Sequence, residues 1–105
     1  MSTTLADVQK SINHQVCRDL IHKDIRDRQT MFLHGLGEEV GEVLGIAKRK
    51  IRSLEKDKQV ATREHLVEEL GDVLWYLTAY CDSCGITLQE IWDYNEAKLE
   101  ERYGR

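Results

Sequence analysis

Two short stretches of the chain carry acidic residues at the same spacing, and these residues could do chemistry together. In the first stretch Glu39 is followed three residues later by Glu42, and in the second Glu69 is followed by Asp72. On an α-helix this spacing places both carboxylates on one face, about one turn apart. Two such helices packed face to face would gather all four carboxylates into one site.

The negative charge of such a site indicates what it would bind. Two like charges about 5 Å apart repel by roughly 3 kcal/mol at an effective dielectric constant near 20. Four converging carboxylates therefore need raised pKa values or a bound cation. Because sites made only of carboxylate oxygens suit hard divalent ions, we predict that Glu39, Glu42, Glu69 and Asp72 bind Mg²⁺, with Mn²⁺ as the alternative.

An acid pair on a helix is by itself an ordinary solvated face, and 32% of this chain is charged. Here the pair is repeated, and both copies border the apolar stripe of their helix when positions are taken at about 100° per residue. Glu38 points nearly opposite the stripe and is predicted to be solvated. Gly41 and Gly71 occupy equivalent places inside the two acid pairs. Since glycine in a helix costs about 1 kcal/mol relative to alanine, they suggest close helix approach or ligand access.

The elements that position the acids are predicted to be helices. The chain has no proline, and it has no long alternating pattern of the kind that indicates strands. We predict an all-α fold, a four-helix bundle with helices over residues 4–23, 30–54, 63–83 and 87–103. Thr4 and Thr87 are the expected helix caps, and Gly85 is expected to end the third helix. Residues 22–29 are predicted to form a loop or frayed turn, and residues 55–62 a polar connection.

The predicted buried sides of the two acidic helices follow from apolar spacing. In the first of them the stripe consists of Phe32, Leu36, Val40, Val43, Ala47, Ile51 and Leu54. In the second it consists of Leu66, Leu70, Val73, Leu77, Cys81 and Cys84.

The acidic stretches also resemble the motifs of a known family. Residues 38–42 and 69–77 resemble the E-E-x-x-E and E-x-x-D motifs of the MazG-like, all-α nucleoside triphosphate pyrophosphohydrolases. Residues 95–103 resemble the N-x-x-K-L-x-x-R-Y run with which many members end. The resemblance covers residues 31–103. It implies Mg²⁺-dependent hydrolysis of a (deoxy)nucleoside triphosphate to the monophosphate and pyrophosphate, in cleaning the nucleotide pool. A phosphoribosyl-ATP pyrophosphohydrolase, which shares the acid motifs, is the related alternative.

Further polar residues fit a nucleotide substrate. On the last helix, Asn95 falls among the apolar positions of the predicted buried side, and Lys98 and Arg102 lie along the border of that side. Next to an acidic metal site, these three residues suit phosphate oxygens. Tyr76 lies one turn beyond Asp72 and could donate a hydrogen bond to a phosphate. The alternative is a structural last helix whose basic side chains extend into solvent.

Gln9 and Asn13 border the apolar stripe of the first helix. Amides at such a margin could read the edge of a nucleobase. The alternative is that neighbouring backbone groups satisfy both side chains.

Composition narrows the class of protein. A chain of 105 residues is expected to form a single domain, residues 1–105. With 15 basic and 19 acidic residues and a net charge of −4, a broad nucleic-acid-binding face is not expected. No targeting segment and no run of about 18 apolar residues is present, so we expect a cytoplasmic protein without a membrane partner.

Other chemistries were weighed against the magnesium site. A di-iron bundle needs Glu-x-x-His pairs, and none of the four histidines has a glutamate three residues before it. A zinc site could combine Cys81 and Cys84 with His14 and Cys17, although free cysteines are commonly small buried apolar groups. A non-catalytic helical interaction module also remains open, and it predicts no stabilisation by Mg²⁺.

Aromatic residues on the last helix indicate assembly. Together with Leu99, the residues Trp92, Tyr94 and Tyr103 would leave much apolar surface exposed on a lone chain, and Trp75 points away from the main stripe of its helix. We therefore predict a homodimer or homotetramer, and the resemblance implies nucleotide sites near the subunit boundary. The alternative for Trp75 is packing against the first helix of its own chain.

Overall fold

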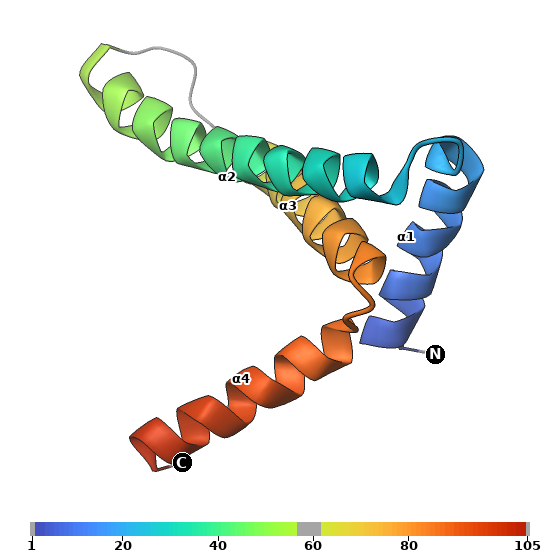
Figure 1. Ribbon diagram of the computed structural model, residues 1–105. Coiled ribbons are helices and arrows are strands. Elements are labelled where there is room, and N and C mark those ends of the chain that lie inside the picture. Colours follow the sequence, from blue (N-terminus) through green and yellow to red (C-terminus); the bar gives the residue numbers. More distant parts are fainter. Residues whose placement is uncertain (1, 57–61, 105) are drawn as a thin grey trace. The chain divides into compact units, whose positions relative to one another are not determined.

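The computed structural model describes residues 2–56 and 62–104, and this part of the chain is built from helices alone. Figure 1 shows them in order: α1 (Leu5–Leu20), α2 (Ile25–Lys56), α3 (Arg63–Ser83) and α4 (Leu88–Tyr103). The predicted all-α class is confirmed. No helix in the described ranges combines the length and apolar composition that a membrane span requires.

The helices are distributed over two compact units. The first unit comprises Met1–Gln29 and Thr78–Arg105, and so contains α1, α4 and the last turns of α3. In this unit α1 packs against α4. The second unit comprises Thr30–Leu77, and so contains most of α2 and of α3.

The predicted caps of α1 and α4 are confirmed. At α1 the Asp7 N–H donates to Thr4 Oγ1 at 3.1 Å, and the Thr4 N–H donates to Asp7 Oδ2 at 3.0 Å. At α4 the Glu90 N–H donates to Thr87 Oγ1 at 3.0 Å, and the Thr87 N–H donates to Glu90 Oε1 at 2.9 Å. Each pair satisfies two N–H groups that a helix start leaves without an intrahelical partner.

Gly85 ends α3 as predicted. Its φ of +71° lies in the left-handed region, where a side chain would be strained. The Ile86 N–H donates to the Cys81 carbonyl at 2.9 Å, and the Gly85 N–H donates to the Asp82 carbonyl at 3.1 Å. These two bonds form a Schellman motif, which satisfies the last carbonyl groups of α3.

The start of α2 differs from the prediction. The helix begins at Ile25 and not near residue 30, because Asp24 caps it: the Arg26 N–H donates to Asp24 Oδ1 at 2.8 Å. The loop prediction for residues 22–29 was therefore wrong from Ile25 onward. The polar connection predicted for residues 55–62 begins later than expected, because α2 continues to Lys56. Residues 57–61 lie outside the described part of the chain.

The core of the second unit lies between α2 and α3. Phe32 is fully buried, and its ring meets Trp75 edge-on, with the centroids 5.9 Å apart. Trp75 is therefore half-buried within its own unit. Trp75 was predicted to point away from the main stripe of its helix and to be covered by a second copy of the chain, with packing against α1 as the alternative. The partner that the structure gives it is Phe32 of α2.

The predicted stripes were only partly correct. On α2, Ile46 is buried although it was not assigned to the stripe, whereas Val40 and Ile51 are 42% and 64% exposed. On α3, Leu66 and Leu70 are exposed. Cys81 is buried and Cys84 exposed. Leu54 lies outside the residues whose side chains are described. Burial depends on the partner helix: Phe32 is buried where it meets Trp75 of α3, a contact that the helical period alone does not reveal.

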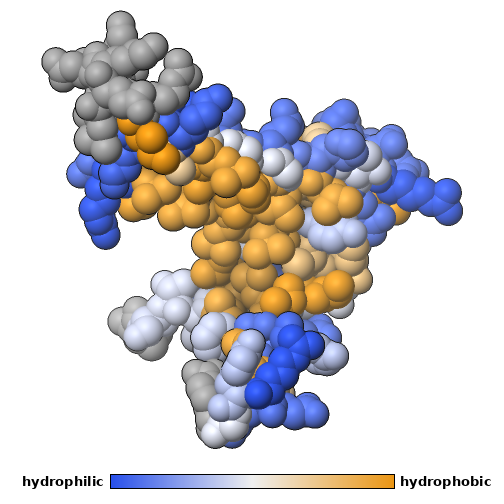
Figure 2. Space-filling view, turned by 90° about the vertical axis from the view of Figure 1, so that its left-hand side faces the viewer, coloured by the Kyte–Doolittle hydropathy of each residue, from blue (hydrophilic) through white to orange (hydrophobic). Residues whose placement is uncertain are grey.

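Much apolar surface of the second unit consequently faces solvent. Figure 2 shows hydrophobic residues gathered over a broad area of the surface. Among the described side chains of residues 30–77, eight large aliphatic ones are 36% to 66% exposed: Leu33, Val40, Leu44, Ile51, Leu66, Val67, Leu70 and Leu74. We call these eight residues the open apolar face.

One glycine marks close approach between the two helices. A Cβ placed at Gly35 would overlap the ring of Tyr76, so the absent side chain lets that ring pack against the α2 backbone. The close approach that we expected at Gly41 and Gly71 is not found, because nothing lies within 4 Å of a Cβ placed at either residue.

Candidate metal centre

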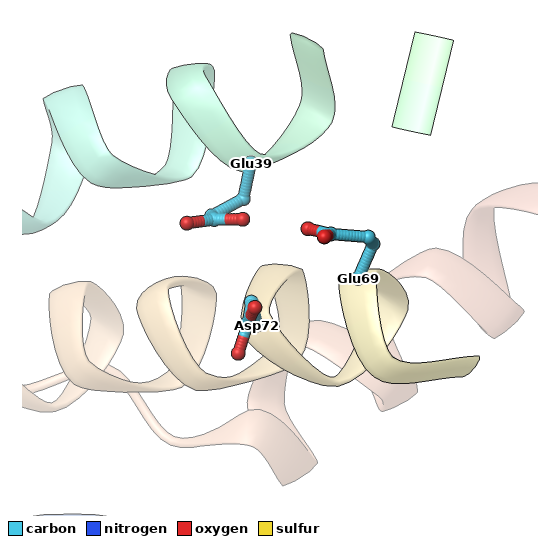
Figure 3. A group of neighbouring side chains, drawn as sticks. All are labelled: Glu39, Glu69 and Asp72. Atoms are coloured by element: carbon cyan, nitrogen blue, oxygen red, sulfur yellow. The ribbon is translucent and has the colours of Figure 1, made fainter. Parts of the chain in front are cut away.

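Three carboxylates come together between α2 and α3. Glu39 extends from α2 toward α3, while Glu69 and Asp72 lie one turn apart on α3 (Figure 3). One oxygen from each residue lies within 4.8 Å of the others, and no other group of three or more His, Cys, Asp or Glu residues in the described ranges meets this condition. Glu39 and Glu69 are half-buried and Asp72 is exposed.

The donor set fits a hard divalent cation. Mg²⁺ binds oxygen ligands at about 2.1 Å in octahedral geometry, so two ligand oxygens on one ion lie about 3–4 Å apart. The limit of 4.8 Å between the three oxygens is close enough for small side-chain rotations to reach that geometry. All three ligands are carboxylates, which favours Mg²⁺ or Mn²⁺ over softer metals.

The electrostatics of the cluster act most strongly on Glu39. Burial raises the pKa of the Glu39 carboxyl above its ordinary value, and the charge of Asp72 raises it further. A hydrogen bond with Glu69 and the charges of Glu69 and Glu42 act in the same direction. Each of these effects disfavours the ionised form of Glu39, so a cation at this point would relieve a repulsion that the fold itself creates.

Glu42 was predicted as the fourth ligand, and the structure leaves it outside the group of three. Its side chain is exposed. Its charge is nevertheless near enough to raise the pKa of Glu39, so it borders the cluster. Glu38 is exposed, as its position on the helix predicted.

One neighbour of the cluster was missed. His65 Nε2 lies 3.4 Å from Glu69 Oε1, one turn earlier on α3. The Glu69 side chain is only 13% exposed, whereas that of His65 is 41% exposed. The sequence contained the signal, since residues four apart on a helix are neighbours, but we had considered the histidines only as metal ligands.

Tyr76 lies in the same unit as the carboxylates and is half-buried. Its ring packs against Gly35 and meets Trp75 edge-on, with the centroids 5.2 Å apart. The packed ring restricts where its hydroxyl can reach. Its hydrogen bond to a phosphate remains a prediction.

The proposed phosphate-binding residues of α4 belong to the first unit. Lys98 is half-buried, and Asn95 and Arg102 are exposed. Lys98 and Asn95 line an open hollow of about 440 Å³ together with Ile86, Glu90, Ile91 and Tyr94. Because the carboxylates belong to the second unit, a shared role of these residues stays a prediction.

Gln9 and Asn13 have partners within the first unit. Gln9 Nε2 donates to Asp82 Oδ1 at 3.2 Å and to the Ile86 carbonyl at 2.9 Å, and Gln9 Oε1 accepts from the Leu88 N–H at 2.8 Å. Asn13 Nδ2 donates to Asp82 Oδ2 at 2.6 Å. These bonds connect α1 to the end of α3 and the start of α4. They give both amides a structural role, and the reading of a base stays a prediction.

The zinc alternative is not supported. Cys81, Cys84, His14 and Cys17 all lie in the described ranges, yet they form no group with metal-ligand spacing. Buried Cys81 instead behaves as an apolar group, and its burial raises the pKa of its thiol.

The described part of the chain is therefore all-α, with a candidate metal site where carboxylates from α2 and α3 converge. The family described as MazG nucleotide pyrophosphohydrolase domain matches residues 27–104, and the chain belongs to this family. It is also 31% identical over 71 residues to the Gene 37 protein of Mycobacterium phage L5, an alignment that covers 68% of this chain and 62% of that protein. The chain thus matches less than two thirds of that relative's length. No solved structure matches it.

Proposed function

We propose that the chain hydrolyses a nucleoside or deoxynucleoside triphosphate to the monophosphate and pyrophosphate, with Mg²⁺ bound by Glu39, Glu69 and Asp72. The observation that carries this proposal is the convergence of these carboxylates, one from α2 and two from α3, in a chain of the MazG family. We further propose that the reaction removes unwanted nucleotides from the cellular pool.

Each part of the proposed site has its own task. A bound Mg²⁺ would neutralise phosphate charge and polarise the phosphorus that water attacks. The three carboxylates would hold the ion and orient the attacking water. Glu42, which borders the cluster, would contribute its negative charge to the same region. We propose that Lys98, Arg102 and Asn95 bind the phosphates, because cations and amides supply the donors that phosphate oxygens accept.

The substrate could instead be phosphoribosyl-ATP, since the related enzymes share the acid motifs. We place the nucleoside triphosphate first because the two acid motifs and residues 95–103 together resemble the nucleoside triphosphate pyrophosphohydrolases, and residues 27–104 match the MazG family. A non-catalytic interaction module does not account for three mutually repelling carboxylates, one of them half-buried with a raised pKa.

A substrate panel tests the reaction. The purified chain is incubated with each of the common ribo- and deoxyribonucleoside triphosphates, and with phosphoribosyl-ATP, in Mg²⁺. Pyrophosphate and orthophosphate are measured separately. We expect pyrophosphate as the phosphorus product of at least one triphosphate, and no release when EDTA replaces Mg²⁺.

Labelled water identifies the bond that is broken. In H₂¹⁸O, attack at the α-phosphorus places ¹⁸O in the monophosphate, whereas attack at the β-phosphorus places it in pyrophosphate. Label in the monophosphate is the expected result. Orthophosphate as the product, or no turnover of any member of the panel, would contradict the proposal.

We also propose that the chain acts as a homodimer or homotetramer. The open apolar face is the observation in support, because a small domain rarely leaves so many aliphatic side chains in solvent. On α4, Trp92, Tyr94 and Tyr103 are 56%, 77% and 72% exposed. A second copy of the chain is the simplest cover for both sets of residues.

A further inference from the structure

His65 lies in the first turn of α3, where its backbone helps to start the helix. The His65 backbone N–H donates to Thr62 Oγ1 at 3.1 Å, which caps this end of the helix. From this first turn the imidazole Nε2 reaches Glu69 Oε1 at 3.4 Å. In the described ranges this is the single ion-pair contact that involves a carboxylate of the cluster.

In a hydrogen bond between the side chains of His65 and Glu69, the imidazole must be the donor. An ionised carboxylate only accepts hydrogen bonds, so Nε2 must carry the hydrogen. The neutral imidazole satisfies this requirement with its hydrogen on Nε2, and no change of charge is needed. At 3.4 Å the two atoms are within ion-pair distance but farther apart than in an ordinary N–H···O hydrogen bond, so we infer that the hydrogen bond forms when Glu69 takes its metal-binding orientation.

We propose that His65 is a positioning residue of the metal site, which holds the Glu69 carboxylate in the orientation that binds the ion. A glutamate side chain has three rotatable bonds, and an unrestrained carboxylate loses rotamer freedom when it binds a metal. A hydrogen-bond donor on one oxygen of Glu69 restricts the side chain before the metal binds, so less rotamer freedom is lost on binding. The remaining lone pairs of the carboxylate stay available for the ion. Because outer partners of metal ligands typically contribute 10- to 100-fold to metal affinity, the effect is measurable.

This inference rests on the proposed function, because it assumes that Glu69 is a metal ligand. His65 itself is not assigned to the ion or to the substrate. Its contribution should therefore appear in the metal concentration that the protein needs, and not in the rate once the metal is saturating.

The test measures Mn²⁺ affinity by electron paramagnetic resonance in the whole chain without nucleotide. We compare the wild type with His65→Ala, His65→Gln and His34→Ala. His34 is an exposed histidine on α2 and serves as the matched control. We expect His65→Ala to weaken Mn²⁺ binding by about 10- to 100-fold and His65→Gln, whose amide nitrogen can donate, to recover most of that loss. His34→Ala should bind as the wild type does.

A second readout separates positioning from folding. The Mn²⁺ concentration for half-maximal pyrophosphate release should rise in His65→Ala by the same factor as the dissociation constant, with kcat at saturating metal nearly unchanged. Wild-type affinity in His65→Ala would overturn the inference while leaving the proposed function standing. Equal losses in His65→Ala and His65→Gln would also overturn it, because the hydrogen bond would then not be the cause. A wild-type chain that binds no Mn²⁺ would overturn both.

Discussion

The carboxyl group of Glu39 lies where its surroundings disfavour its own ionisation. Burial and the neighbouring charges of Asp72 and Glu69 raise the pKa of its carboxyl. The folded chain therefore holds the Glu39 proton to a higher pH than the unfolded chain does. As pH rises from the ordinary value of 4.5 through the raised pKa, the metal-free folded state loses stability relative to the unfolded state.

Glu39→Gln should therefore make the metal-free protein more stable at pH 7, because the amide carries no charge and has nearly the same shape. We expect a higher melting temperature in EDTA than the wild type has. The wild type should gain stability when Mg²⁺ is added, and the variant should gain much less, since it lacks a ligand. Thermal melts at pH 7 with EDTA or with Mg²⁺ measure both effects. Glu38→Gln is the control, and an equal rise in its melting temperature would contradict the account.

The three residues of the cluster could be predicted from their spacing along the sequence. The same spacing wrongly added Glu42 as a fourth member. The helical period correctly placed Glu39, Glu69 and Asp72 on facing margins, because a backbone direction fixes where a side chain starts. The helical period does not determine where the carboxylate at the end of a long, flexible side chain lies. Glu42 therefore remains outside the group of three, although its helical position is favourable. The same helical period also predicts the contact between His65 and Glu69, which are four residues apart, but we applied it only to the acidic residues.

At the scale of the elements, α2 and α3 approach each other where Gly35 meets Tyr76. Gly35→Ala should displace the ring and lower the free energy of unfolding by roughly 1–2 kcal/mol, since overpacking outweighs the gain in helix propensity. Gly41→Ala is the matched change on the same helix, and it should raise the free energy of unfolding by about 0.5–1 kcal/mol because its Cβ meets nothing within 4 Å.

Urea unfolding followed by circular dichroism measures this pair of glycine variants. The expected result is a change of opposite sign in the two midpoints. If Gly35→Ala were as stable as Gly41→Ala, the packing of Tyr76 against α2 would be wrong.

The ends of the helices were more predictable than their buried faces. Thr4, Thr87 and Gly85 work through bonds to residues within five positions of themselves, so local sequence is sufficient. Asp24 works in the same way, and it was missed because the charged residues around it were taken to indicate a loop. The buried faces depend on a partner helix, which the period does not identify. Trp75 illustrates this: its partner, Phe32, is 43 positions away in the chain.

At the scale of the whole molecule, the open apolar face leads to a prediction about assembly. Leu44 is 66% exposed in the middle of this face on α2. If a second copy covers the face, Leu44→Lys should place a charge in the interface and shift the apparent mass toward the 12.2 kDa of one chain. Light scattering at assay concentration, with circular dichroism as a check on folding, measures this shift.

Ile21 provides the control for Leu44, because it is 61% exposed and lies outside the open apolar face. Ile21→Lys should leave the apparent mass of the wild type unchanged. A wild type that is fully active as a 12.2 kDa monomer would contradict the proposed assembly.

We propose that the carboxylates of α2 and α3 hold the ion that hydrolysis requires. The most direct measurement is the rate of pyrophosphate release by Glu69→Gln at saturating Mg²⁺, on the best triphosphate of the panel and beside Glu38→Gln. We expect Glu69→Gln to keep its helical circular dichroism and lose turnover, whereas Glu38→Gln should retain most of the wild-type turnover. Full wild-type turnover in Glu69→Gln would contradict the account.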